Sequence, residues 1–201
     1  MTMPLDDLSD LGDEVLLARY AQGDRMAARA LVLRLSPRVL GYAARLLGDR
    51  AEAEDVAQEA MMRLWRIAPD WRSGEAQVTT WLYRVVTNLV TDRQRARRRR
   101  ATNGLDEAPE VPDGSPGVVT RLIEADRMAA LDAALVQLPD RQRQAVVLRH
   151  IEGLSNPEIA SVMEIGVEAV ESLTARGKRA LAALLSGQKA ALGYEDEGAE
   201  A

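Results

Sequence analysis

The sequence predicts an all-α fold with two small helical domains joined by a flexible acidic linker, the second containing a helix-turn-helix. Apolar residues recur at three- and four-residue intervals along most of the chain, and no segment alternates as a strand would. Residues 101–117 break this pattern with three Pro, three Gly and four acidic residues, a composition that cannot bury a core. Near the C-terminus, two short helical segments meet at Gly166, as in a helix-turn-helix.

These observations divide the 201-residue chain into four parts. We expect an N-terminal domain over 1–100, a linker over 101–118, a C-terminal domain over 119–186 and an acidic tail over 187–201. The net charge of −5 hides an asymmetry: the first 100 residues carry 17 Arg against 14 acidic residues, and the remainder 9 basic against 17 acidic. This balance argues against a non-specific nucleic-acid coat protein but permits a local basic surface.

In the N-terminal domain, periodicity predicts helices over 13–22, 24–47 and 50–68, and then a helix containing Trp81. Gly23 and Gly48 mark helix ends, and Asp24 can cap the second helix. In the C-terminal domain, the expected helices cover 119–137, 140–152, 156–163 and 167–185. Pro139 and Pro157 stand where first-turn prolines are tolerated, and we expect Gly166 to supply the unusual dihedral angles of the turn.

The helix around Trp81 leads directly into an arginine cluster. Trp81, Leu82 and Val85 begin a buried face at helical spacing, and six of the eight residues from Arg93 to Arg100 are Arg. Guanidinium groups fit phosphate oxygens, and aromatic faces can stack on unpaired bases. The segment therefore fits a single nucleic-acid strand. The alternative is a core helix with a solvated basic end, or a targeting patch.

The segment Ala51–Trp65 predicts an amphipathic helix with two distinct faces. Its apolar, core-forming stripe consists of Ala53, Val56, Ala57, Ala60, Met61, Leu64 and Trp65. The opposite face carries Glu52, Asp55, Gln58, Glu59 and Arg66. Acidic and amide groups suit a basic helical partner, although an ordinary solvated face has the same pattern.

The segment Leu154–Leu181 carries the helix-turn-helix pattern, in which the second helix enters the DNA major groove. Ala160 is small, where two helices have to approach closely. Arg176, Lys178 and Arg179 lie on the exposed face of the second helix and can contact phosphates or guanine edges. The alternative is a helical hairpin that does not bind DNA.

Composition excludes several other classes of protein. The chain has no Cys and one His, His150, which excludes a disulfide scaffold and a multi-histidine metal site. No apolar run approaches the ~18 residues of a membrane span, and the acidic N-terminus lacks a signal-peptide core. No nucleophile–base pair or phosphate-binding glycine loop is visible. We therefore expect a cytoplasmic protein without catalytic residues, metal or cofactor.

In their order along the chain, these segments resemble the extracytoplasmic-function (ECF) group of bacterial sigma factors. The ordered set is AEDVAQEAMMRLW, WLYRVVTN with Asp92 and the arginine run, the acidic linker, and LPDRQRQAVVLRHIEGLSNPEIA. The resemblance covers about residues 13–185. It implies a subunit that binds core RNA polymerase, directs it to promoter DNA and assists melting, and it implies an anti-sigma partner. A stand-alone helix-turn-helix regulator is the alternative, but it leaves Ala51–Trp65 and Trp81–Arg100 unexplained.

The resemblance also implies three contact sites. Contact with the clamp helices of the largest polymerase subunit is expected from Glu52, Asp55, Gln58, Glu59 and Arg66. Contact with the −10 strand is expected from Arg72, Ser73, Gln77, Thr79, Thr80, Trp81, Arg84, Asn88, Arg93 and Arg97. Contact with the −35 element is expected from Ser172, Ala175, Arg176, Lys178 and Arg179. Glu171 stands where many relatives have a basic residue, and Leu173 is a second departure of this kind.

Overall fold

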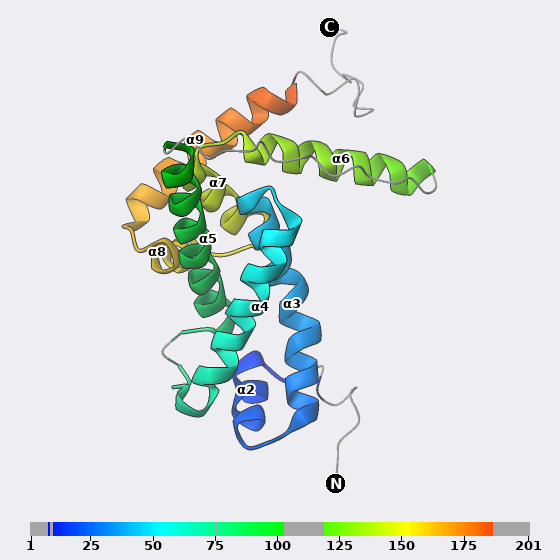
Figure 1. The fold of residues 1–201 in the computed structure, drawn as a ribbon, viewed down its shortest axis with the longest axis vertical. Helices are drawn as coiled ribbons and strands as arrows, with labels where there is room; N and C mark the ends of the chain where they lie inside the picture. The colour runs from blue at the N-terminus through cyan, green and yellow to red at the C-terminus, as the bar shows by residue number, and fades with distance from the viewer. Residues whose placement is uncertain (1–7, 9, 75, 103–118, 187–201) are drawn as a thin grey trace, which may run out of the picture.

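The computed structural model describes residue 8 and residues 10–74, 76–102 and 119–186. These residues form helices and short connections, which confirms the all-α prediction. Helices α3, α4 and α5 run side by side along the long axis, with α2 at one end, α6, α7 and α9 at the other, and α8 beside α5 (Figure 1). Most of the expected linker and the whole acidic tail lie outside the described residues.

The N-terminal helices are α2 (Asp13–Ala21), α3 (Arg25–Leu47), α4 (Arg50–Ile67), the short 3₁₀ turn η1 (Ala68–Asp70) and α5 (Val78–Thr102). Helices α3 and α4 each begin after an Asp whose side chain accepts hydrogen bonds from their free N–H groups. Asp24 accepts hydrogen bonds from the N–H groups of Met26 and Ala27, and Asp49 accepts one from Glu52. Gly48 ends α3 in the left-handed conformation, with φ of +67°. The expected boundaries are therefore confirmed to within a residue or two.

The core of the N-terminal helices lies between α3, α4 and α5. The apolar stripe expected on α4 is buried from Ala53 to Leu64, and Trp65 is partly buried against Tyr20. Tyr42 and Tyr83 are the largest fully buried side chains, and their rings meet edge to face at 5.1 Å. The hydroxyl of Tyr42 lies 2.8 Å from that of Thr87, so this buried polar group has a partner.

The C-terminal helices are α6 (Val119–Val136), α7 (Asp140–Val146) with its π-helical extension η2 (Val147–Ile151), α8 (Asn156–Met163) and α9 (Val167–Ser186). Pro139 immediately precedes α7, and Pro157 lies in the first turn of α8, as expected. Glu158 accepts hydrogen bonds from the backbone N–H and the hydroxyl of Ser155, which closes the first turn of α8. The helix-turn-helix is formed by α8 and α9.

The turn between α8 and α9 differs from the prediction. The left-handed residue is Glu164, with φ of +53°, whereas Gly166 does not have a positive φ, so the expectation for Gly166 was wrong. The reason is the hydrogen bond at the end of α8. With Glu164 left-handed, the N–H of Ile165 reaches the carbonyl oxygen of Ala160 at 3.1 Å and satisfies it. The turn itself lies between Met163 and Val167, where the sequence predicted it, and only the identity of its left-handed residue differs.

A close helix–helix approach lies at Gly177, in the middle of α9. A Cβ atom at this position would lie 2.6 Å from Val146 Cγ2 and 3.1 Å from the carbonyl oxygen of Gln142, both on α7. Ala160, for which the sequence predicted a close approach, is half-buried against the core. Contact between α7 and α9 at this distance therefore depends on the absence of a side chain at Gly177.

The C-terminal helices dock against the end of α3 through a buried arginine. Arg143 is 6% exposed and donates hydrogen bonds to the carbonyl oxygens of Leu46 at 2.5 Å, Val136 at 2.6 Å and Leu138 at 3.1 Å. These carbonyls lie near the ends of α3 and α6, where a cation is favoured. Burial lowers the pKa of the Arg143 guanidinium. Because its acceptors belong to both helical groups, Arg143 fixes their relative position.

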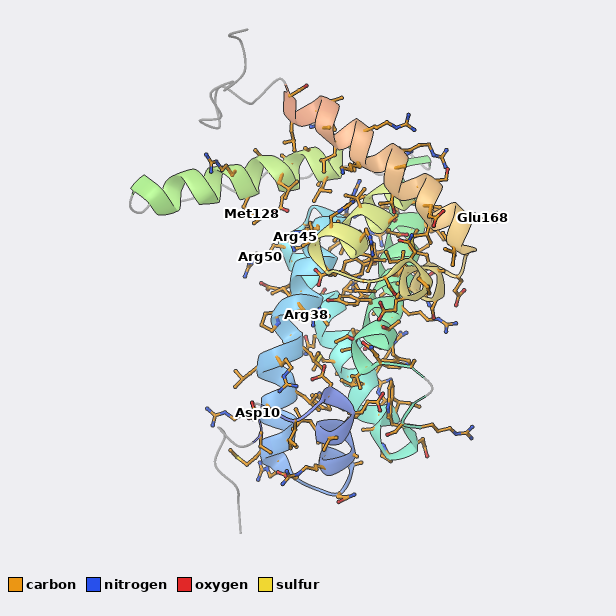
Figure 2. All side chains as sticks on the ribbon, turned by 180° about the vertical axis from the view of Figure 1, so that it is seen from behind. Asp10, Arg38, Arg45, Arg50, Met128 and Glu168 are labelled. Atoms are coloured by element: carbon orange, nitrogen blue, oxygen red, sulfur yellow. The ribbon has the colours of Figure 1, made fainter. Side chains whose placement is uncertain are left out.

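A second contact between the two groups lies nearby on the surface. Arg45 Nε lies 3.2 Å from Asp132 Oδ1, and Figure 2 shows Arg45 at the end of α3 that faces α6 and Met128.

Within the described residues, no helix combines the length and the apolar character needed to cross a membrane.

Candidate functional site

One exposed face of α4 carries the acidic and amide groups singled out in the sequence. Asp55, Gln58 and Arg66 are exposed, and Glu52 and Glu59 are half-buried. Arg63 donates a hydrogen bond to Glu59 at 2.8 Å and thereby lowers the pKa of that carboxyl group. The Glu59 carboxyl group is therefore ionised at neutral pH.

An apolar groove runs beside this acidic face, between α3 and α4. Its volume is about 560 Å³, and its lining residues are Val32, Ser36, Pro37, Leu40, Glu54, Ala57, Gln58, Met61, Met62 and Trp65. Met62 is 45% exposed and Val32 41%, although both are apolar. An apolar groove with an acidic rim suits a partner helix that carries apolar and basic side chains. The sequence pattern did not reveal the groove, because it arises only when α3 and α4 lie side by side.

Two tryptophans line a second cavity, which lies at the C-terminal end of α4. The rings of Trp71 and Trp81 lie edge to face, 5.9 Å apart, and line a cavity of about 240 Å³ together with Ile67, Asp70, Arg72 and Ala76. The indole Nε1 of Trp71 is buried without a hydrogen-bond partner. Aromatic walls with an unused N–H donor suit an unstacked base. The expected contact residues begin at Arg72, the next residue of the same loop, and do not include Trp71.

The expected −10 residues divide between this cavity and the surface of α5. Arg72, Ser73 and Gln77 are exposed next to the cavity, and Thr79 is half-buried. Thr80 is only 8% exposed, so its side chain belongs to the packed interior of this structure. Further along α5, Arg84 and Asn88 are exposed on the side that faces α8.

Arg93 and Arg97 point from α5 towards the start of α4. Arg97 Nη2 lies 2.8 Å from Glu52 Oε1 and 3.3 Å from Asp49 Oδ2, and Arg93 Nη1 donates to the carbonyl oxygen of Glu52 at 3.2 Å. These two expected DNA contacts are therefore engaged within the protein. Arg99 and Arg100 are exposed at the end of α5. The arginine run thus serves two purposes, since part of it joins α5 to α4 and part of it faces solvent.

The residues expected to contact the −35 element are all exposed on α9. They are Ser172, Ala175, Arg176, Lys178 and Arg179. Arg176 and Arg179 each donate from Nε to a backbone carbonyl one turn earlier, which aligns both guanidinium groups along the helix. Burial lowers the pKa of His150, and the positive charges of Lys178 and Arg149 lower it further. Arg176, Lys178 and Arg179 are exposed on this side of α9, so their charges are accessible to an anionic partner.

The two departures from the resemblance have different structural settings. Leu173 is partly buried and packs against the core, so its role at this position is structural. Glu171 is exposed and accepts a hydrogen bond from Asn156 Nδ2 at 3.3 Å, across the turn between α8 and α9.

Comparison with known proteins identifies two conserved regions in the expected order. The chain matches Sigma-70 region 2 over residues 31–100 and Sigma-70, region 4 over residues 128–181. The RNA polymerase sigma-H factor of Pseudomonas aeruginosa is 33% identical over 177 residues, which cover 84% of this chain and 91% of that protein. The ECF RNA polymerase sigma-E factor of Escherichia coli K12 is 31% identical over 179 residues, covering 85% of this chain and 93% of that protein.

Two solved structures have a similar fold. The sigma factor RpoE in complex with the anti-sigma factor NepR, from Bartonella quintana, matches with a TM-score of 0.64 at 22% identity, covering 79% of this chain and 96% of that one. CnrH in complex with the cytosolic domain of CnrY matches with a TM-score of 0.61 at 29% identity, covering 87% of this chain and 97% of that one. The order of the two regions and these relatives do not favour a stand-alone regulator. The chain belongs to the ECF group of sigma factors and directs RNA polymerase to promoters as an alternative sigma factor.

Proposed function

We propose that the chain binds core RNA polymerase through the acidic face of α4 and the apolar groove beside it. The observation that carries this assignment is the juxtaposition of the Asp55 and Glu59 side chains with exposed Met62. In the family that the chain belongs to, the corresponding helix docks on the clamp helices of the largest subunit. Apolar burial in the groove contributes affinity, and the carboxylates orient a basic partner helix.

The two DNA elements are assigned to different helical groups. The domain over 1–100 would hold the −10 strand, with an extruded base between Trp71 and Trp81 and the backbone along α5. The cost of unstacking, a few kcal/mol, is offset by stacking and pocket contacts. The domain over 119–186 would read the −35 element through the exposed side of α9. Arg176, Lys178 and Arg179 supply its positive charge.

Three further parts of the proposal follow from the family. An anti-sigma partner is supported by RpoE, whose structure was solved with the anti-sigma factor NepR. Catalysis of RNA synthesis belongs to core polymerase, and the sigma chain contributes binding alone, without a cofactor. Since it acts in transcription, we place its site of action in the cytoplasm.

Charge reversal of Asp55 and Glu59 together tests the polymerase-binding face. We expect Asp55→Arg/Glu59→Arg to weaken binding to core polymerase about tenfold or more, because two attractive charges become repulsive. The affinity is measured by fluorescence anisotropy with labelled sigma chain, and circular dichroism checks the fold. The matched control is Glu14→Arg/Glu168→Arg, on α2 and α9, which changes the net charge equally outside this face. Equal affinities for the two variants would exclude the assignment of this face.

A separate measurement tests the function as a whole. The wild-type chain should form a complex with core polymerase and support transcription from a promoter that core alone does not use. If the chain failed to bind core polymerase yet bound duplex DNA tightly by itself, a stand-alone regulator would replace the proposal.

A further inference from the structure

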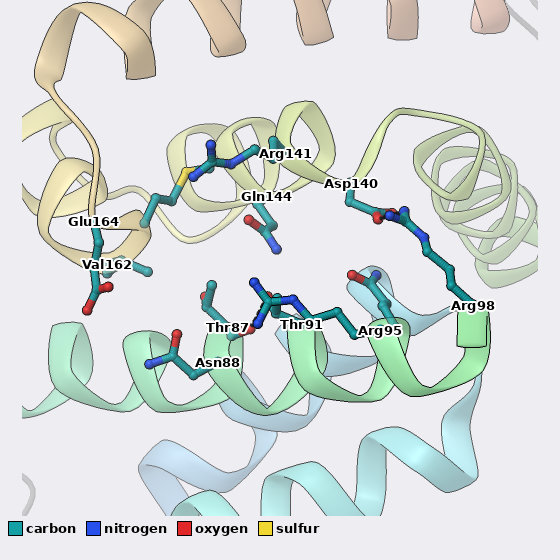
Figure 3. A pocket seen from close by; sticks show the side chains of 12 residues that line it. Thr87, Asn88, Thr91, Arg95, Arg98, Asp140, Arg141, Gln144, Val162 and Glu164 are labelled. Carbon is teal, nitrogen blue, oxygen red and sulfur yellow. Dashed lines mark hydrogen bonds and ion pairs between the residues drawn. The ribbon is translucent and has the colours of Figure 1, made fainter. Parts of the chain in front are cut away.

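Three acidic side chains of the C-terminal helices are engaged within the protein. Glu158 closes the first turn of α8. Glu164 accepts hydrogen bonds from Arg84 of α5, and Asp140 accepts one from Arg98. Figure 3 shows Glu164 and Asp140 beside the polar cavity that separates α5 from the C-terminal helices. These three carboxylates therefore already have partners that hold a helix end or join two helices.

Glu171 has a different setting, on the exposed side of α9. In the described part of the chain, no ion pair joins it to a basic side chain, although α9 also carries Arg176, Lys178 and Arg179. Its Oε1 accepts a hydrogen bond from Nδ2 of half-buried Asn156, the first residue of α8, at 3.3 Å. This bond restricts the orientation of the carboxylate and leaves lone pairs on both oxygens for further donors.

The position of Glu171 along α9 is the one at which a recognition helix meets base edges. Glu171 is the fifth residue of the 20-residue helix, and recognition helices contact bases through their N-terminal residues. It lies one turn before Ala175, on a shared exposed face. The basic residues Arg176, Lys178 and Arg179 follow later on α9, where they can hold phosphates. The acidic group therefore lies at the reading end of the helix and the basic groups lie beyond it.

A carboxylate at this position can distinguish among the four bases, because it only accepts hydrogen bonds. In the major groove, cytosine offers the N4 amino donor, whereas guanine N7 and O6 and thymine O4 only accept. Adenine places the acceptor N7 beside its N6 donor, so a carboxylate is partly repelled there. Bringing the charge of Glu171 against any base removes water from it, and only cytosine replaces the lost hydrogen bonds without an opposing acceptor.

We propose that Glu171 selects a cytosine in the −35 element and that Asn156 is the positioning residue for its carboxylate. This inference rests on the proposed assignment of the −35 element to α9. Its negative charge lowers the affinity for every sequence by repelling phosphates, and Arg176, Lys178 and Arg179 offset that loss. The departure from a basic residue at this position thus changes which base is read, and base reading at α9 is retained.

The test selects DNA with the complete holoenzyme. Core polymerase and the full chain are mixed with a duplex promoter library whose −35 region is randomised, and bound DNA is sequenced. Glu171→Gln keeps the size of the side chain, but its amide pairs with N6 and N7 of adenine. Asn156→Ala removes the positioning contact. The matched control Glu168→Gln removes the same charge from an exposed site one turn earlier on α9.

We expect the wild-type holoenzyme to prefer cytosine at one position of the enriched element by about fivefold or more. Glu171→Gln should shift that position to adenine and leave the other positions unchanged. Asn156→Ala should reduce the cytosine preference by about two- to fivefold, the effect of one lost hydrogen bond. Glu168→Gln should keep the wild-type preference. Circular dichroism checks the fold of each variant, and fluorescence anisotropy with single-base variants of the selected duplex gives the affinities.

An identical base preference in wild type and Glu171→Gln, with affinity raised by the same factor for every sequence, would overturn the inference. Glu171 would then act only as a repulsive charge. A changed preference in Glu168→Gln would also overturn it, and an unchanged one in Asn156→Ala would exclude the positioning role. Failure of the proposed function is distinguishable, because the wild-type holoenzyme would then not form or would enrich no −35 sequence at all.

Discussion

Replacement of Gly177 by Ala tests the contact between α7 and α9 that positions the recognition helix. In a helix interior, Ala is favoured over Gly by about 1 kcal/mol. Against this gain, the new Cβ would lie 2.6 Å from Val146 Cγ2 and 3.1 Å from a backbone oxygen of α7. Val is stiff and the backbone oxygen cannot rotate away, so overpacking costs about 1–3 kcal/mol. We expect the free energy of unfolding to fall by up to about 2 kcal/mol.

The matched control is Gly41→Ala, also inside a long helix. Its Cβ would meet only the end of the flexible Arg45 side chain, at 3.1 Å. We therefore expect stabilisation of about 0.5–1 kcal/mol from helix propensity alone. Urea unfolding followed by circular dichroism measures both variants, and anisotropy with −35 duplex DNA shows whether α9 has moved. If Gly177→Ala stabilised the chain as much as Gly41→Ala does, the close approach of α7 and α9 would be refuted.

Three other predictions follow from single contacts. Arg143→Met should lower the free energy of unfolding by about 2–4 kcal/mol, because three buried carbonyls lose a charged donor; thermal unfolding measures it. Hydrogen bonds from Ser155 lower the pKa of Glu158, so its stabilisation is present above the unfolded value of 4.5 and is lost as pH falls through the lower folded value. The urea midpoints of wild type and Glu158→Gln should therefore converge between ~pH 5 and ~pH 2, and a constant gap would contradict this. Arg99→Ala should weaken −10 strand binding equally for all sequences, and should reduce the slope of log affinity against log salt concentration by about 1. Arg72→Ala should instead change the sequence preference. Competition assays with altered −10 strands distinguish the two effects.

The sequence predicted the helices well because their start and stop signals are local. Asp24 caps α3 through its own backbone neighbours, and Gly48 ends it, so both can be read without knowledge of the rest of the fold. The position of the turn between α8 and α9 was predicted correctly, but its left-handed residue was not. Glycine is the usual left-handed residue, whereas here the hydrogen bond to a carbonyl of α8 places Glu164 in that conformation. The preference of glycine for positive φ therefore does not decide the left-handed position when a hydrogen bond at the helix end requires another residue there.

The candidate sites were predicted in part. The acidic face of α4 and the basic side of α9 follow from helical periodicity, since side chains three and four residues apart share a face. The cavity between Trp71 and Trp81 and the apolar groove had no such signal, because each needs two elements to meet. Arg93 and Arg97 belong to the same arginine run as Arg98, but their position on the helix turns them towards α4. The composition of the run does not reveal this division.

The sequence by itself determined the helical class, the two-part organisation and the family, and it predicted candidate faces for polymerase and DNA contact. All of these depend on spacing along the chain and on the order of segments. Only the tertiary structure decided which arginines stay available, because Arg143, Glu164 and Asp140 meet their partners across 40 to 100 residues of sequence. Long-range pairing of this kind depends on how two helical groups dock, and helical periodicity carries no information about that docking.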